Sequence, residues 1–159
     1  MGWVSLMENV AFFFHIVGVM LFVAGIVLAG AAFEAARRRE RPSEIALLLG
    51  LTRVGVVLVA VGTVLAGVFG LWLVHLGKWG YGAGWVDASI VLFLVVIGLG
   101  GVGGRRPKEA RLLASRLDER DVGADGELRA LLDDRVSRAE NYVSLLLVLV
   151  IIALMVFKP

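Results

Sequence analysis

Two histidines, His15 and His75, are the side chains of this 159-residue sequence that can bind a metal or a haem iron through a neutral ring nitrogen. The sequence has no cysteine, which excludes disulfides, thiolate metal sites, cysteine nucleophiles and haem attached through a Cys-x-x-Cys-His motif. Two imidazoles on one iron would hold haem b, whose reduction potential depends on its axial ligands and their surroundings. The two histidines therefore raise the hypothesis of a bis-histidine haem b site.

A stripe of small and polar residues follows one face of the first predicted helix, at steps of three and four: His15, Gly18, Phe22, Gly25 and Ala29. Small residues on such a face let two helices approach closely, or they leave room for a flat cofactor. The haem interpretation places the cofactor between the first and second helices, beside Gly18 and Gly25, with His15 and His75 as its ligands. In the alternative, His15 bonds to a neighbouring helix and His75 is an interfacial residue.

No other pattern in the sequence predicts chemistry. The P-loop, zinc-protease and serine-hydrolase motifs do not occur, and we predict no catalytic residue. The glycine-rich run at residues 98–104 ends an apolar segment, so we assign Gly100 and Gly104 to close helix packing. Thr63 is nearly alone as a polar group near the middle of a span, which argues against solute transport by this chain alone. The chain also lacks a soluble module with a basic face for nucleic acid.

Four long apolar runs carry these residues, at 10–33, 45–76, 85–102 and 142–157. Each run is long enough, at about 1.5 Å per residue, to cross a hydrocarbon layer of about 30 Å as a helix. Because 59% of the residues are hydrophobic, no room remains for a soluble catalytic domain. We predict an all-α, four-helix, up-down membrane bundle as a single domain, with spans at about residues 10–33, 50–76, 85–104 and 140–157.

The positive charges are sorted to one side of these spans. Of the 16 Lys and Arg residues, 14 lie between the first two runs, near the start of the second, or between the last two. Only Lys78 and Lys158 lie on the other side. The loops of membrane proteins that are rich in Lys and Arg stay on the cytoplasmic side. We therefore predict a multi-pass protein of the bacterial cytoplasmic (inner) membrane with both termini outside.

The segment at residues 105–139 is the one sizeable polar region, and we place it in the cytosol. Within it, residues 107–120 have the pattern of a short amphipathic helix, which we expect on the inner membrane surface with its arginines toward anionic headgroups. Two glycines interrupt it, and Asp125 is a suitable cap for the helix that follows. Residues 127–157 contain no breaker, so we predict one continuous helix there. Ser43 is a fair N-cap for the second span.

The stretch from His15 to Gly25 reads His-Ile-Val-Gly-Val-Met-Leu-Phe-Val-Ala-Gly and resembles a pattern of several small bacterial membrane families. That pattern, roughly His-x-x-Gly-x-x-x-Trp-x-Gly-Gly, occurs in copper-resistance-D-like proteins and in membrane-bound protoporphyrinogen oxidases, where it implies haem binding at the histidine. Here Phe22 replaces the tryptophan and Ala24 replaces a glycine. The oxidases pair their histidine with a lysine of a later helix, and residues 85–102 contain none, so we do not carry that activity over.

As a whole, the chain is similar to a family of predicted bacterial integral membrane proteins with no assigned function. The shared features are the four-span layout, the charged cytosolic segment before the last span, and an ending like residues 155–159. Together, the residues and the resemblance favour a small membrane protein that binds haem b for electron transfer or haem handling. The alternative is a non-catalytic subunit that stabilises a larger membrane complex, or a homo-oligomer, by packing its glycine-rich helix faces against neighbouring helices.

Overall fold

The computed structural model describes residues 2–77 and 82–158, which are almost entirely helical. The helices are α1 (Gly2–Arg37), α2 (Pro42–Leu76), α3 (Gly84–Gly103), α4 (Arg105–Glu119), α5 (Gly126–Leu132) and α6 (Arg135–Phe157). Four stretches are long and apolar enough to cross a membrane: Ser5–Arg37, Pro42–Leu76, Gly84–Glu119 and Gly126–Phe157. The prediction of an all-α chain with four candidate spans is therefore confirmed. Lys78, one of the two lysines that we assigned to the outer side, lies outside the described residues.

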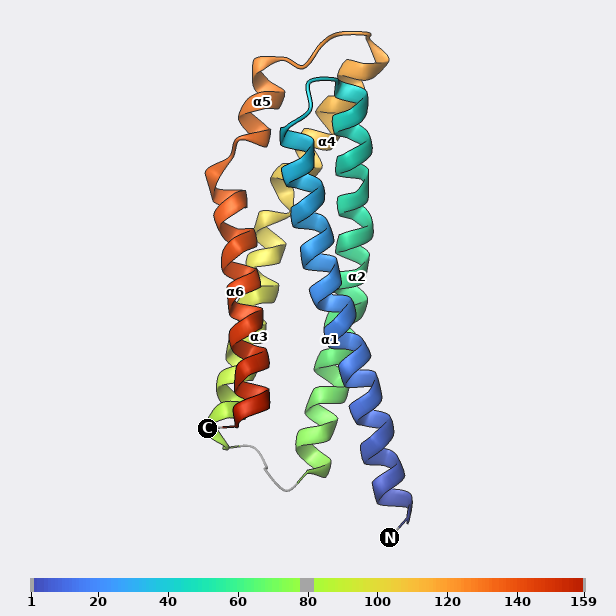
Figure 1. Cartoon of the computed structure of the whole chain (residues 1–159), viewed down its shortest axis with the longest axis vertical. Coiled ribbons are helices and arrows are strands. Elements are labelled where there is room, and N and C mark those ends of the chain that lie inside the picture. The colour runs from blue at the N-terminus through green and yellow to red at the C-terminus, as the bar shows by residue number, and fades with distance from the viewer. Residues whose placement is uncertain (1, 78–81, 159) are drawn as a thin grey trace.

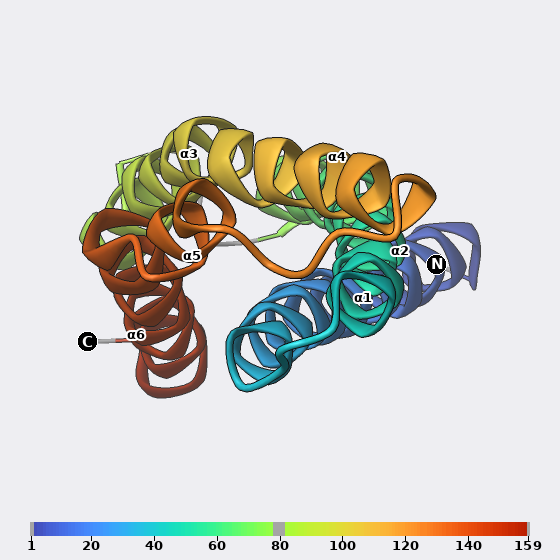
Figure 2. The ribbon, with the colours of Figure 1, turned by 90° about the horizontal axis from the view of Figure 1, so that it is seen from above.

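The long helices lie side by side in two antiparallel pairs, α1 with α2 and α3 with α6 (Figure 1). Helix α1 begins and α6 ends at the same end of the bundle, which we call the terminal end. The opposite end holds the α1–α2 turn, α4 and α5, and we call it the arginine-rich end. Seen along the bundle, the two pairs lie opposite one another, and α4 reaches from α3 across to α2 (Figure 2).

The α1–α2 pair is packed backbone against backbone at its glycines. A Cβ atom added at Gly25 would lie 2.6 Å from the carbonyl oxygen of Gly55 and 2.7 Å from the backbone nitrogen of Val59. Gly18, two helix turns closer to the terminal end, faces the backbone of Ala66 in the same way. Small residues at a contact let membrane helices approach this closely. These glycines are therefore needed for the packing of α1 on α2.

Between the two ends of the bundle, the two helix pairs meet in a buried apolar cluster, formed by Phe22, Ile26, Val96, Val148 and Ile151. The rings of Phe22 and Phe93 lie 5.4 Å apart in this layer, which joins α1 to α3. Many other large apolar side chains of the long helices are exposed on the outside of the bundle. That distribution fits a bundle in lipid, because acyl chains are as apolar as these side chains.

A second buried cluster lies at the arginine-rich end and joins the end of α1, the start of α2, α4 and α5: Phe33, Ala36, Ile45, Leu49, Ala110, Ala114, Leu117, Leu128 and Leu132. The amphipathic helix predicted at residues 107–120 is present as α4. Its apolar face packs on protein, because Ala110 and Ala114 are fully buried in this cluster. Its position on the inner membrane surface, with the arginines toward headgroups, stays a prediction. Ile45 and Leu49, in the first turns of α2, pack against the apolar face of α4. Burying these apolar side chains between the helices removes them from water, which stabilises the contact.

Aspartates set the helix boundaries around α5. Asp125 caps α5 as predicted, since its side chain accepts a hydrogen bond of 2.8 Å from the backbone nitrogen of Leu128. The continuous helix predicted over residues 127–157 is wrong, because the chain breaks between α5 and α6. Asp134 caps α6 there, accepting hydrogen bonds from the backbone nitrogen and the hydroxyl of Ser137 at 2.9 and 2.8 Å. Such caps satisfy N–H groups that a helix leaves unpaired at its start.

The N-cap predicted for α2 is wrong, and the helix packing predicted at the end of α3 has no partner within the described part of the chain, so packing there against another chain stays a prediction. The N-cap of α2 is Arg41, not Ser43, because proline at the following position suits the first turn of a helix. The glycines at the end of α3 do not pack against another helix in the described part of the chain. Outside the backbone of α3 itself, no described atom lies within 4 Å of a Cβ added at Gly98, Gly100 or Gly101.

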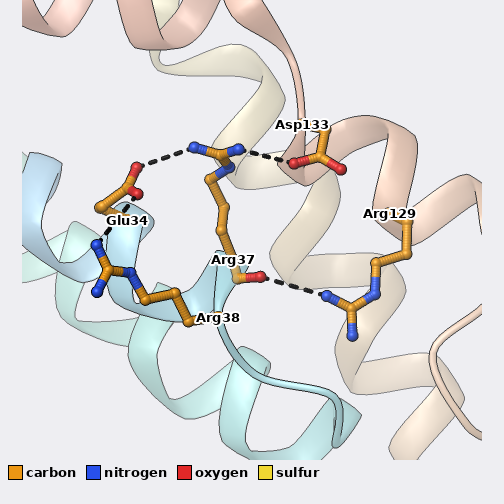
Figure 3. Close-up of polar contacts among 5 residues, drawn as sticks. All are labelled: Glu34, Arg37, Arg38, Arg129 and Asp133. Carbon is orange, nitrogen blue, oxygen red and sulfur yellow. Dashed lines mark hydrogen bonds and ion pairs between the residues drawn. The ribbon is translucent and has the colours of Figure 1, made fainter.

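Arg37, at the end of α1, links α1 to α5 and to the turn that follows it. Its guanidinium contacts a carboxylate oxygen of Glu34 at 2.9 Å and one of Asp133 at 2.8 Å (Figure 3). Its carbonyl oxygen accepts a hydrogen bond of 3.3 Å from the guanidinium of Arg129 on α5 (Figure 3). A cation is favourable at the C-terminus of a helix, where carbonyl groups lack partners within the helix. The arginine-rich end is therefore held by charges as well as by its apolar cluster.

Candidate cofactor site

His15 lies on α1 with its ring against α2, and 8% of the residue is exposed. Its Nδ1 atom lies 2.9 Å from the carbonyl oxygen of Ala66. One turn further along α2, Gly70 provides the space that the ring occupies, because a Cβ there would lie 2.9 Å from Nδ1 and from Cε1. The ring is thus held in place by one hydrogen bond and by the missing side chain of a glycine.

This hydrogen bond determines which nitrogen of the neutral ring carries the proton. A carbonyl oxygen can only accept, so Nδ1 is the donor and Nε2 carries a lone pair. Histidines that bind metals commonly donate their other N–H to a backbone carbonyl, which orients the ring and makes the ligating nitrogen more basic. His15 therefore has the tautomer and the support of a metal-binding imidazole.

A cavity of about 940 Å³ lies beside His15, between the α1–α2 pair and the α3–α6 pair. Its lining residues fall within 8–22 of α1, 66–77 at the end of α2, 85–94 of α3 and 148–158 at the end of α6, which all belong to the terminal half of the bundle. The side chains of Phe22 and Phe93 close it toward the middle of the bundle. Cofactor pockets commonly measure roughly 300–1,000 Å³ and are mostly apolar. The size and lining of this cavity suit a large amphipathic cofactor.

Charged groups of the lining lie at its terminal end. Glu8 comes from the first turns of α1, and Lys158 follows the last residue of α6. The Nζ atom of Lys158 lies 5.8 Å from the centre of the Trp85 ring. Ser89, further in, is buried, and its hydroxyl donates a hydrogen bond of 2.7 Å to the carbonyl oxygen of Trp85. The cavity therefore has an apolar interior containing one imidazole, that of His15, and a charged mouth.

The other residues that we predicted for the site lie elsewhere. Gly18 and Gly25 face the backbone of α2 so closely that a flat cofactor does not fit between α1 and α2 at their level. His75 is exposed near the end of α2 and does not line the cavity. The structure therefore brings His15 to a cavity but does not bring His75 to the same place. Among the described residues, no three His, Asp or Glu side chains gather as a site for a bare metal ion.

Sequence reasoning missed the part that α3 and α6 take in this cavity. We placed the cofactor between the first two helices because its two predicted ligands, His15 and His75, belong to them. The cavity instead has its opposite wall in Ser89 and Phe93 of α3 and in Met155 of α6. Hydropathy and spacing within one helix do not indicate which helix lies across a bundle. The sequence therefore held no direct signal for this wall.

Residues 9–159 match the protein family described as "predicted integral membrane protein (DUF2269)". The match covers nearly the whole chain, so the protein belongs to this family of predicted integral membrane proteins. No curated protein and no solved structure matches the chain. Family membership and the four candidate spans agree that this is a multi-pass membrane protein in contact with the lipid bilayer.

Proposed function

We propose that this member of the family binds haem b through Nε2 of His15, in the cavity between the α1–α2 and α3–α6 pairs. The observation that carries the proposal is the hydrogen bond of 2.9 Å between Nδ1 of His15 and the carbonyl oxygen of Ala66, next to a cavity of about 940 Å³. The hydrogen bond leaves the lone pair on Nε2, and the cavity supplies the volume. The proposal changes the bis-histidine hypothesis in two respects. His75 is no longer a ligand, and the haem lies between the two helix pairs instead of between α1 and α2 beside Gly18 and Gly25.

The chemistry of the cavity fits the chemistry of haem b. Its porphyrin ring is flat and apolar, which matches an interior closed by Phe22 and Phe93. Its two propionates are anionic, and the charged mouth with Lys158 gives them a place near water. Leaving them in the apolar interior would be unfavourable, because an unpaired charge is expensive to bury. The haem would therefore lie with its propionates toward the terminal end.

When bound, haem supplies one-electron redox chemistry, or it is itself the cargo that the protein holds. The part of this chain is to present one nitrogen base, to hold that base still, and to exclude water from around it. Ala66 orients the imidazole, Gly70 gives the ring its space, and the apolar lining lowers the local polarity. Burial, the axial ligand and hydrogen bonds to that ligand are among the means by which a protein tunes haem potential.

We also propose that the terminal end faces outward and the arginine-rich end faces the cytosol of a bacterium. The support is the charge distribution, since 14 of the 16 Lys and Arg residues belong to the arginine-rich side. In that orientation, the haem site lies in the outer half of the cytoplasmic membrane. A haem at this depth could exchange electrons with a partner on the outer face.

The experiment that tests the haem proposal is spectroscopic. The full-length protein, purified in mild detergent and supplied with haemin, should show a Soret band and sharp visible bands on reduction. His15→Ala should lose this spectrum or bind haemin much more weakly, because no other imidazole lines the cavity. His75→Ala is the matched control and should keep the spectrum, since His75 is exposed outside the cavity. A spectrum that survives His15→Ala, or is lost only in His75→Ala, would refute the proposal.

A second candidate function is that of a non-catalytic subunit in a larger membrane complex or a homo-oligomer. The observation in its favour is the open face of α3, where Cβ positions at Gly98, Gly100 and Gly101 meet no described atom outside their own helix. Such glycines let another membrane helix approach closely. Purification under mild detergent tests this function. A stoichiometric partner that is lost in Gly100→Leu would support it, and a monomer with bound haem would count against it.

A further inference from the structure

His15 and Met155 occupy equivalent positions on two helices that run in opposite directions. Phe22 of α1 and Val148 of α6 belong to the same buried cluster in the middle of the bundle. His15 lies seven residues from Phe22 toward the terminal end, and Met155 lies seven residues from Val148 toward the same end. Seven residues make two helical turns, or about 10.5 Å, and return almost to the same helix face. Both side chains therefore lie two turns beyond a shared layer, on the faces that meet in it.

Both residues also line the same cavity, His15 from α1 and Met155 from α6. Met155 packs against the buried cluster, is only partly buried, and lines the cavity. A methionine side chain has three rotatable bonds and adapts to the space around it. Its sulfur is a soft ligand that suits haem iron, and a histidine–methionine pair is one of the standard axial combinations.

The remaining lining residues offer the iron a poorer second ligand. Glu8 and Lys158 are charged and lie at the mouth of the cavity, and Asn9, next to Glu8 in α1, is polar and belongs to the same terminal end. The hydroxyl of Ser89 already donates to a carbonyl oxygen of its own helix. A neutral ligand from the apolar interior, opposite the imidazole, is available from Met155.

We propose that Met155 is the second axial ligand, so that haem b lies between His15 of α1 and Met155 of α6. This inference rests on the proposed haem function and adds to it the coordination and its consequences. With an imidazole and a thioether, the iron is six-coordinate and low-spin. Its reduction potential is higher than that of a bis-histidine haem in similar surroundings, because a thioether favours the ferrous state. The site then favours electron transfer over haem delivery, since both positions on the iron are filled by the protein.

The test compares the full-length protein with Met155→Leu, Met155→His and Met20→Leu, all purified in detergent and supplied with haemin. Leucine nearly conserves the volume of methionine, so Met155→Leu removes the ligand while keeping the packing. Met20→Leu is the matched control, because Met20 is 66% exposed on α1 and does not line the cavity. The absorption and electron paramagnetic resonance spectra of the ferric form report the ligands, and a redox titration reports the potential.

The wild-type protein and Met20→Leu should be low-spin and show the weak sulfur-to-iron charge-transfer band of the ferric form. Met155→Leu should lose that band and become high-spin. Met155→His should be low-spin again, without the band and with a lower reduction potential. Haem that is bound through His15 but has the same spectrum in the wild type and Met155→Leu would overturn the inference and leave the proposed function intact. Absence of haem binding in the wild type would overturn both.

Discussion

Replacing Gly25 with alanine distinguishes its two predicted roles, space for a cofactor and contact between helices. The added Cβ would lie 2.6 Å from the carbonyl oxygen of Gly55, whereas an ordinary contact begins at 3.4 Å. The helices must therefore move apart by about 0.8 Å at this level, because the contacting atoms are backbone and cannot rotate away. Overpacking of this kind costs about 1–3 kcal/mol. The helix propensity of alanine offsets up to about 1 kcal/mol of that cost.

The matched control is Gly98→Ala on α3, where the added Cβ meets no described atom outside its own helix. Both variants gain the same helix propensity, so the difference between them isolates the cost of the contact. We expect Gly25→Ala to unfold with a free energy about 1–3 kcal/mol lower than that of Gly98→Ala. At roughly 2–4 °C for each kcal/mol, the apparent melting temperature in detergent should be roughly 2–12 °C lower. Circular dichroism during heating, or titration with a denaturing detergent, measures this difference.

The result also bears on the haem site. Gly25 lies ten residues from His15, or about 15 Å along α1, and does not line the cavity. Gly25→Ala should therefore lower stability while leaving the haem spectrum of the folded protein unchanged. Equal stabilities for the two variants would refute the packing argument. A changed haem spectrum in a stable Gly25→Ala protein would return Gly25 to the cofactor site.

Gly70→Ala should push the ring of His15 aside and shift the haem spectrum, because the added Cβ would lie 2.9 Å from Nδ1 and Cε1. The control is Gly50→Ala on the same helix, which lies outside the cavity and whose added Cβ meets no described atom beyond its own helix backbone, so its spectrum should not change; identical spectra for the two variants would contradict the role given to Gly70. Asp133→Ala should loosen α5, because it removes the ion pair of 2.8 Å with Arg37 of α1, and a protease should then cleave the α4–α5 connection faster than in the wild type. Unchanged cleavage would show that the apolar cluster alone holds α5 in place. A cysteine at Ser5 should react with an impermeant thiol reagent on intact cells and one at Ser43 should not, and the reverse pattern would overturn the proposed orientation.

Much of the fold could be predicted from the sequence because membrane helices are governed by local properties. Long apolar runs must form helices in lipid, since the backbone has no water to bond with. The four candidate spans followed from this rule, and the amphipathic α4 followed from the spacing of its apolar residues. Asp125 could be recognised as a cap because capping depends on neighbours within one turn. His15 could be singled out because a polar ring inside an apolar run needs a partner.

The predictions that the structure does not bear out are of two kinds, contacts between distant segments and the exact ends of helices. The apolar face of α4 could lie on lipid or on protein, and only the tertiary structure shows Ala110 against the start of α2. The break at Asp134 was missed because no glycine or proline marks it. The glycines around Gly100 have the spacing of a packing motif, yet spacing says nothing about whether a partner helix is present.

Sequence alone is enough to establish an all-helical membrane protein with four candidate spans and one histidine in a stripe of small residues. Hydropathy and helical periodicity suffice for that conclusion, because both act along a single segment. The packing of the helices was needed to show that Gly18 and Gly25 join α1 to α2, that His15 bonds to Ala66, and that the cavity lies toward α6. These outcomes depend on how four helices far apart in the sequence pack around one another. A cavity is the space that such packing leaves unfilled, and it has no pattern of its own in any one segment.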